Sequence, residues 1–200
     1  MYAKILGLIA IAVAALMVSA GSASATTGTD SAEGSPVETG DPFHAVSEGS
    51  TTLDGTVNIT CKSSTVQGDI ESPGSPTTTL QAKLTIFTFE ECGNTTITIV
   101  NTGTMEIHTD TPEVDDGNGI LTSTGVEVTV LTHNVLGTVH CLYVTEETSV
   151  GTLTGSSTGT ATLDIGSSGI QRLATDFGCG NSSVWTGSYA VTAPDYLYIH

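Results

Sequence analysis

The sequence predicts an all-β fold: an antiparallel β-sandwich, or a flattened barrel, of about 10 to 12 strands. Three observations support this class. Apolar residues alternate with polar residues along many short segments, as they do on strands with one buried face. Turns rich in Gly and Asn interrupt these segments about every 8 to 12 residues. Threonine is the commonest residue, and its β-branched side chain favours strands over helices.

The expected strands follow from apolar residues that share one face. After Ile86 the alternation shifts by one position to Phe87 and Phe89, which predicts a β-bulge or a strand buried on both faces. Residues 169–176 are the only segment that could form a helix, and the apparent strand at 196–199 is expected to belong to the fold. In chain order, the groups that share a face are Val57, Ile59 and Cys61; Leu80, Ala82, Leu84 and Ile86; Ile97 and Ile99; Met105 and Ile107; Val126, Val128 and Val130; Val139, Cys141 and Tyr143; and Trp185, Gly187, Tyr189 and Val191.

The N-terminus has the three parts of a secretory signal peptide. Lys4 precedes an uncharged apolar run at 5–18, and Ala23 and Ala25 provide small residues before a cleavage site. The run is too short to span a bilayer as a helix. We therefore expect a signal peptide at 1–25, a disordered acidic Ser/Thr/Gly leader at 26–42 and a single β domain at 43–200.

The charge of the chain limits its partners. The formal net charge is −17, with 21 acidic and 4 basic residues. Binding to nucleic acid requires a basic surface, and anionic membranes repel an acidic protein. We expect no nucleic-acid partner and no membrane span after removal of the signal. The charge favours cations and basic partners.

Four cysteines follow the signal: Cys61, Cys92, Cys141 and Cys179. An even number of cysteines in an exported chain predicts two disulfides and an extracellular location. Three pairings are open; we favour Cys61–Cys92 and Cys141–Cys179, because each then ties a strand to a turn within its own half. The repeated words Cys-Gly-Asn-Thr-Thr and Cys-Gly-Asn-Ser-Ser hint at a duplication, although the two pairs are unequally spaced.

The second half of the chain carries a resemblance. Three short segments carry it: Cys141-Leu-Tyr, Trp185-Thr-Gly-Ser-Tyr189-Ala-Val191 and Leu197-Tyr198. They resemble segments of uncharacterised small secreted all-β proteins of high-GC Gram-positive bacteria. The resemblance implies export, disulfides and a sandwich fold. It carries no catalytic residue to this chain.

The sharpest candidate for a binding site is an acidic strand followed by an acidic loop. Residues two apart on a strand share a face, about 7 Å from one another. Oxygen ligands on an Asp/Asn/Gly loop suit Ca²⁺, whereas a histidine with carboxylates suits Zn²⁺ or Mn²⁺. If this strand paired with 125–130, Glu127 would join the site; the alternative is a solvated strand face with an acidic turn. The candidate ligands are Glu106, His108, Asp110, Asp115 and Asp116.

Three further patterns have a functional form, and two of them also have a purely structural explanation. The segment Gly155-Ser-Ser157-Thr-Gly159 has the form of a hydrolase nucleophile motif, which requires a strand–turn–helix elbow; the alternative is a plain turn. Trp185, Tyr189, Tyr196 and Tyr198 could form a sugar-stacking platform, but the first two alternate on one strand face, as core residues do. Asn58, Asn94 and Asn181 begin glycosylation sequons.

These observations predict a secreted, non-enzymatic β protein that acts by surface-associated binding or by self-association. Cell-surface glycan, a cation or a second copy are the expected partners. A first alternative is a Ca²⁺- or carbohydrate-binding module that uses 106–118. A second is a subunit whose leader adds to a neighbour's sheet, and a third is a secreted hydrolase acting through Ser157.

Overall fold

The fold is all-β and antiparallel, as the sequence predicts. It is described from a computed structural model that covers residues 26–30, 33–55, 58–75, 78–109, 117–134, 137–146, 148–166, 169–175, 179 and 181–200. The strands of these residues are β1 (Thr26–Thr29), β2 (Pro42–Ser47), β3 (Thr51–Asp54), β4 (Ile59–Cys61), β5 (Ser63–Ser75), β6 (Thr78–Glu90), β7 (Thr95–Asn101), β8 (Thr104–Thr109), β9 (Gly119–Thr124), β10 (Glu127–Asn134), β11 (Gly137–Val144), β12 (Thr148–Thr154), β13 (Thr162–Ile165), β14 (Gly169–Thr175), β15 (Ser182–Ala193) and β16 (Tyr198–Ile199).

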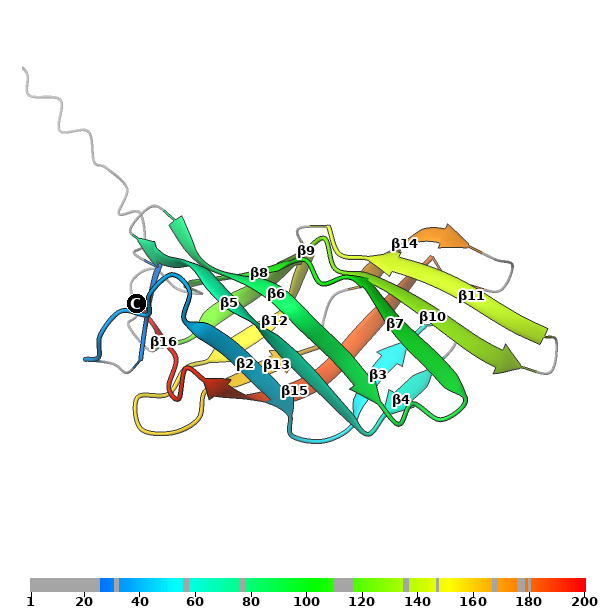
Figure 1. Cartoon of the computed structure of the whole chain (residues 1–200), viewed down its shortest axis with the longest axis horizontal. Coiled ribbons are helices and arrows are strands. Elements are labelled where there is room, and N and C mark those ends of the chain that lie inside the picture. Colours follow the sequence, from blue (N-terminus) through cyan, green and yellow to red (C-terminus); the bar gives the residue numbers. More distant parts are fainter. Residues whose placement is uncertain are drawn as a thin grey trace, which may run out of the picture.

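Eight of these strands close into a barrel, shown on the left in Figure 1. The ring runs β2-β5-β6-β8-β9-β12-β13-β15 and returns to β2, with antiparallel pairing at every step. Closure of the ring gives each of the eight strands a neighbour on both sides. The predicted sandwich or flattened barrel is thus a closed barrel.

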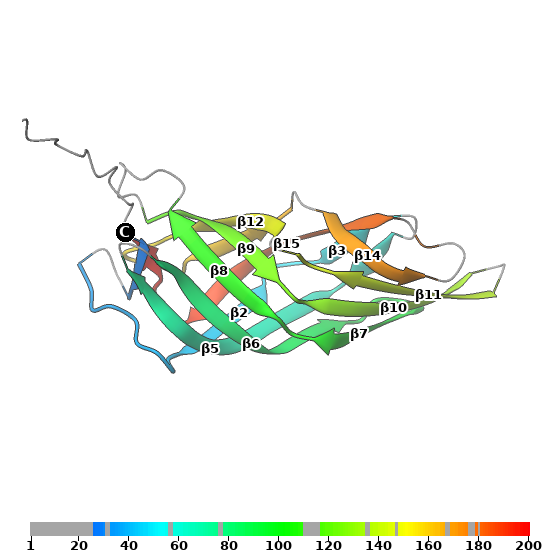
Figure 2. The ribbon, with the colours of Figure 1, turned by 90° about the horizontal axis from the view of Figure 1, so that it is seen from above.

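A second sheet extends the barrel along its long axis (Figure 2). Its order is β4-β3-β15-β14-β11-β10-β7. Apart from β15, each of its strands adjoins a barrel strand across a short bend: β3 follows β2, β4 precedes β5, and β7 precedes β8. The same holds for β9 and β10, β11 and β12, and β13 and β14. The wall is therefore a meander of long bent strands, each beside its neighbours in sequence.

Glycines form two of these bends. Gly103 lies between β7 and β8 with φ 64°, and Gly125 lies between β9 and β10 with φ 73°. A Cβ on Gly103 would lie 2.4 Å from the carbonyl oxygen of Thr124. Only glycine suits both the left-handed backbone and this close approach.

The core fills the inside of the wall. Inward side chains alternate with outward ones, as in Thr104–Thr109, where Met105 and Ile107 are buried. An aromatic cluster lies where the barrel meets the second sheet. Trp185 packs against Phe87 with ring centroids 4.7 Å apart, and against Phe89 and Tyr189 at 5.8 Å each.

The predicted bulge lies in β6. Gln67 is opposite Ile86, whereas Gly68 is opposite Leu84, so Thr85 has no partner on β5. The extra residue places Ile86 outside, with 44% of its surface exposed, and turns Phe87 inward. The shift in the apolar alternation is thus a β-bulge.

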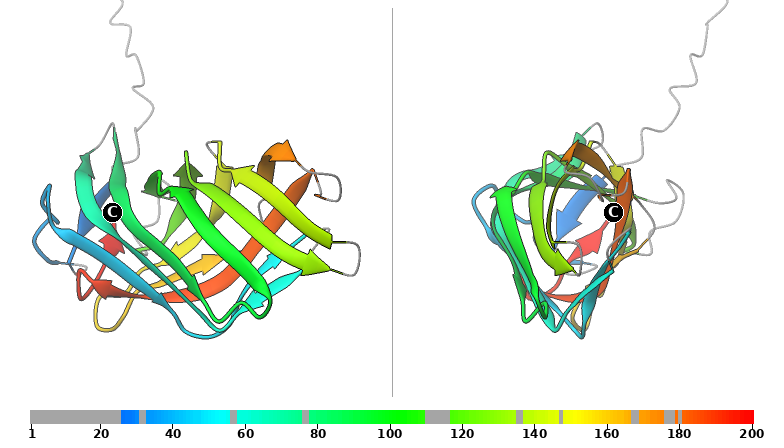
Figure 3. Two further views of the ribbon diagram at one scale, coloured as in Figure 1. Left: turned by 45° about the vertical axis from the view of Figure 1, so that its right-hand side comes forward. Right: turned by 90° about the vertical axis from the view of Figure 1, so that its right-hand side faces the viewer.

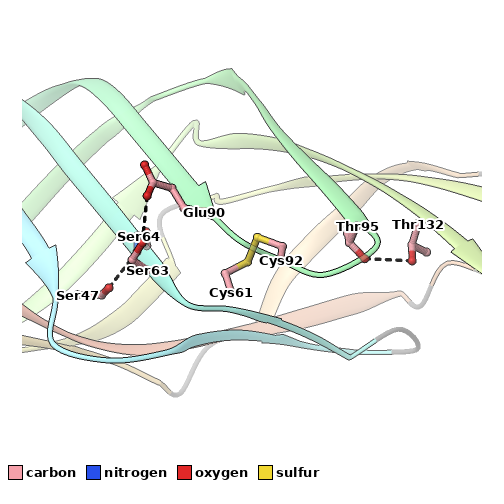
Figure 4. The surroundings of a disulfide bond; sticks show 8 residues. All are labelled: Ser47, Cys61, Ser63, Ser64, Glu90, Cys92, Thr95 and Thr132. Atoms are coloured by element: carbon pink, nitrogen blue, oxygen red, sulfur yellow. Dashed lines mark hydrogen bonds between the residues drawn. A yellow bond between two sulfur atoms is a disulfide. The ribbon is translucent and has the colours of Figure 1, made fainter.

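Both predicted disulfides are present, and Figure 4 shows the bridge between Cys61 and Cys92. Cys61–Cys92 ties β4 to the turn after β6, and Cys141–Cys179 ties β11 to the connection between β14 and β15. Cys61 and Cys141 are buried, whereas Cys92 and Cys179 are half-buried. Each bridge thus fastens a core strand to a more exposed connection.

One expectation for local structure was wrong, and the one segment that could have formed a helix is a strand. The leader is not disordered at 26–30 and 33–42: β1 pairs with β5 and β16, and Val37 is buried in the core. A short polar segment can be ordered by the edges of existing strands, which its own composition does not reveal. Residues 169–175 form β14 rather than a helix, because β11 and β15 pair with its two edges. In the part of the chain described, no helix is long and apolar enough to cross a membrane.

Candidate functional site

One joint in the wall is open over half its length, between β6 and β7. Along one edge, β6 pairs with β5 over its whole length. Along the other, residues 80–83 pair with β8, and the ladder then stops. β7 pairs with β10 on one edge only. The facing edges of residues 85–90 and Thr95–Asn101 therefore carry no ladder, and we call this joint the open seam (Figure 3).

The open seam is closed at both ends. At one end, the backbone N–H of Leu84 donates to the carbonyl of Gly103 at 3.1 Å, and the Thr102 hydroxyl donates to the carbonyl of Leu84. At the other end, the turn at 91–94 joins the strands, and the Cys61–Cys92 bridge fastens this turn to β4. The Lys62 ammonium also pairs with the Glu91 carboxylate there. The opening is thus a bounded gap in the ladder rather than a frayed end.

The seam presents backbone hydrogen-bonding groups. In an extended strand, successive residues direct their N–H and C=O groups to opposite edges. About half of the backbone groups of residues 85–90 and Thr95–Asn101 therefore point into the seam. Such groups act as a template for pairing with another strand.

The side chains beside the seam are unusually apolar for an edge. Ile86 and Val100 flank it on the outside, with 44% and 59% of their surfaces exposed. Phe89, Ile97 and Ile99 are half-buried behind it and pack on the core. β7 has the sequence TTITIVN, with no charge, Pro or Gly. Native edge strands are generally protected by such residues or by a β-bulge. β7 lacks the protective residues and has only a bulge, at Val100, which has no partner on β10.

The interior behind the seam is filled. Two cavities, of about 30 and 20 Å³, are both lined in part by Phe87 and Trp185. The first is lined mainly by Leu84, Met105 and Leu163, and the second by residues that include Val128. Spaces of this size hold about one small molecule such as water. Among the described residues, the interior is a packed core.

Burial perturbs one titratable group of this core. Desolvation raises the pKa of the Tyr189 phenol well above its ordinary value, and neighbouring Ser64 and Trp185 oppose the shift. The phenol is therefore neutral at physiological pH. It belongs to the core beneath the seam and offers no acid or base near neutrality.

The predicted metal ligands are brought together only in part. Glu106 and His108 do share the outer face of β8, opposite buried Met105 and Ile107. The Glu106 carboxylate accepts hydrogen bonds from Gln81 at 3.1 Å and from a threonine hydroxyl of β6 at 3.4 Å. The other three candidates, Asp110, Asp115 and Asp116, lie outside the described residues. Within the described ranges, no group of three or more His, Cys, Asp or Glu residues could hold a metal ion.

The pairing that would have placed Glu127 beside Glu106 does not occur. β8 pairs with β9, so Glu106 lies opposite Thr122. Glu127 comes after the bend at Gly125 and lies opposite Asn101 on β7. The bend moves the second apolar run into the second sheet, away from Glu106.

The serine pattern lies in a loop without the context of a nucleophile elbow. Residues 155–159 connect β12 to β13, and a strand rather than a helix follows them. The Ser156 hydroxyl accepts a hydrogen bond from the backbone N–H of Gly159 at 2.8 Å, as in a turn, while Ser157 is exposed. The ring of His200, which the hydrolase alternative would need, is hydrogen-bonded to the Thr29 hydroxyl at 3.0 Å.

The aromatic residues do not form one platform. Tyr189 is buried and Trp185 is half-buried, which confirms their assignment to the core. Tyr196 is 40% exposed, and half-buried Tyr198 packs against the ring of His200, with centroids 4.9 Å apart. The three sequon residues, Asn58, Asn94 and Asn181, are all exposed.

The open seam was not predicted from the sequence. The available signal was the absence of charge, Pro and Gly in Thr95–Asn101, which marks a strand without protective residues. Comparisons with known proteins add no assignment: no protein-family model, no curated protein and no solved structure matches this chain.

Proposed function

We propose that this is an exported, disulfide-stabilised barrel without catalytic activity that acts by binding at the cell surface or by self-association. The observation that carries the proposal is the filled interior, whose cavities of about 30 and 20 Å³ leave no room for a substrate. We therefore place the function on the outer wall. The chain is acidic, with a net charge of −17, and the wall contains the unpaired edge of β7.

Export and disulfide formation are tested first. Antibody detection in fractions of the source organism, on non-reducing gels, is expected to find an oxidised protein without residues 1–25 outside the cytosol. A reduced, full-length cytosolic protein would contradict the proposal.

Binding is tested with the purified oxidised protein. Fluorescently labelled protein is added to intact source cells, and self-association is followed by sedimentation up to about 100 μM, where contacts with a Kd near 0.1 mM are detected. We expect saturable cell binding or concentration-dependent assembly. Absence of both, or turnover in a screen of esterase, peptidase and glycosidase substrates, would refute the proposal.

A Ca²⁺- or carbohydrate-binding role for 106–118 is the second candidate. It is favoured by the shared, partly exposed face of Glu106 and His108 on β8. Thermal melts with and without millimolar Ca²⁺ are expected to show an increase in Tm that Glu106→Gln and His108→Ala reduce. No change in Tm with metal would remove this candidate and leave the first one standing.

A further inference from the structure

We propose that the open seam binds an extended, net-basic peptide segment of a partner protein, inserted as an additional strand between β6 and β7. This inference rests on the proposed binding function and specifies its site. The two edges that it joins are residues 85–90 and Thr95–Asn101, neither of which has a ladder on this side.

An inserted strand would satisfy both edges at once. A strand has two hydrogen-bonding edges, and here each would face one edge of the protein. The ladder of the wall, which now stops at residue 83 of β6, would then continue to the turn at 91–94. About six or seven residues suffice, because a strand rises about 3.3 Å per residue and β7 has 7 residues.

The inside and the outside of the wall differ in polarity, and this difference determines which side chains the peptide should carry. On the inside, the half-buried Phe89, Ile97 and Ile99 border the aromatic cluster. On the outside lie solvent and the exposed Ile86 and Val100. Because side chains alternate between the two faces of a strand, the peptide should carry apolar residues at every second position. β7 itself has this pattern.

The charge of the peptide follows from the charge of the protein. The chain has a net charge of −17, and Glu90 and Glu91 lie at the turn end of the seam, exposed to solvent. Lys62, which pairs with Glu91, offsets one of these charges. Attraction between opposite charges speeds association and selects partners, so a segment carrying Lys or Arg is favoured.

Two other occupants fit less well. The chain's own leader forms β1, which already pairs with β5 and β16. A strand from a folded second copy has one edge in use, as β7 has with β10. Such a strand could satisfy one edge of the seam but not both. An unpaired segment of a partner protein can satisfy both.

The probe is the synthetic peptide Lys-Thr-Ile-Thr-Ile-Thr-Val-Lys, added to the oxidised protein up to about 1 mM. Amide hydrogen exchange measures the backbone directly. In the free protein, the backbone amides that point into the seam should exchange fast; they belong to residues 85–90 and Thr95–Asn101. Peptide should slow them at least about tenfold, while amides of β12, which is paired on both edges, stay unchanged. No added protection would overturn the proposal.

Modified peptides test insertion between two edges. Two versions carry N-methyl groups at alternate residues, one set for each edge of the peptide, so each removes the donors along one edge and keeps the side chains. Each should bind at least about tenfold more weakly, because several hydrogen bonds are lost. If only one version binds more weakly, the peptide pairs with a single edge and insertion is refuted.

A protein variant with a matched control connects the seam to function. Thr98→Lys places a charge on the exposed face of β7, whereas Thr152→Lys does so on the exposed face of β12. Thr98→Lys should weaken peptide binding about two- to fivefold through repulsion of the peptide lysines, with Thr152→Lys unchanged. If the protein self-associates, and Thr98→Lys abolishes this assembly while Thr152→Lys does not, the seam binds a second copy of the chain. That result would overturn the proposal.

The cell-binding assay separates the two proposals. If Thr98→Lys lowers cell binding and Thr152→Lys does not, both proposals are supported. Cell binding that is equal in both variants would refute the seam as the site and leave the proposed function intact. If the peptide inserts into the seam but the protein neither binds cells nor self-associates, the proposed function is refuted and the seam proposal is not.

Discussion

Removing either disulfide should cost a similar free energy of unfolding but have different local effects. The two bridges close loops with sequence separations of 31 and 38 residues. The loss of chain entropy in the unfolded state then corresponds to about 3.7 and 3.9 kcal/mol at 25 °C. For a domain of this size, each loss should lower Tm by roughly 7 to 15 °C.

The local effects differ because only one bridge lies at the open seam. Cys61–Cys92 fastens the turn at 91–94 to β4; without it, the turn end of the seam is held by the Lys62–Glu91 pair and by backbone contacts. Exposed ion pairs of this kind contribute about 1 kcal/mol or less. Exchange of amides in Thr95–Asn101 should therefore accelerate when this bridge is removed, and not when Cys141–Cys179 is removed.

The assay uses the double variants Cys61→Ala/Cys92→Ala and Cys141→Ala/Cys179→Ala. Guanidinium unfolding is followed by the fluorescence of Trp185, the single tryptophan of the chain, and native-state hydrogen exchange is measured strand by strand. If the free energies of unfolding differ by more than about 2 kcal/mol, the entropic account is wrong for this fold. If both variants accelerate exchange in β7 equally, the first bridge has no special role at the seam.

Three other substitutions test the bulge, a bend and the buried phenol. Thr85 has no partner on β5, so its deletion should lower the free energy of unfolding by about 1 kcal/mol or less. Thr88 is opposite Thr65, so its deletion shifts the register and should lower that free energy by about 3 kcal/mol or more. Equal losses in denaturant unfolding would contradict the bulge. Gly103→Ala should be more destabilising than Gly93→Ala by about 1 to 3 kcal/mol. Both glycines have a positive φ, but only at Gly103 would the new Cβ lie 2.4 Å from a carbonyl oxygen. Equal Tm values for the two variants would argue against the clash. Burial raises the pKa of Tyr189 above its unfolded value of 10.0, so its contribution to stability is complete below pH 10 and is lost at higher pH. Between about pH 10 and 11, Tyr189→Phe should therefore lose less stability than wild type. Parallel curves of stability against pH for the two proteins would refute this.

Most of the fold follows from local patterns in the sequence. Alternation of apolar residues predicts the inward faces of Met105 and Ile107 and the break in parity at Phe87, because a strand has a fixed period of two. Those positions are buried, and the break is a bulge at Thr85. The favoured cysteine pairing had a separate basis, namely that each bridge stays within one half of the chain, and both bridges are present.

The candidate sites depended on which strands become neighbours, and local patterns do not determine this. The segments 85–90 and Thr95–Asn101 are separated by a short turn, yet they form no ladder with one another, and β7 pairs with β10 instead. The bends at Gly103 and Gly125 direct β7 and β10 into the second sheet, which also separates Glu127 from Glu106. The order of the leader has a similar origin: β1 relies on the edges of β5 and β16, which come from distant parts of the sequence.

The meander of the wall has a consequence for how the chain acquires its fold. Nearly every ladder joins neighbours in sequence, so hairpins can form early from local contacts. Two strands near the C-terminal end are exceptions: β15 pairs with β2 and β3, and β16 pairs with β1, all near the start of the described chain. Bringing such distant segments together has the largest loop-closure cost. A growing chain therefore stays an incomplete, open-edged sheet until Ser182–Ala193 has emerged, and closure of the ring is the step that completes folding.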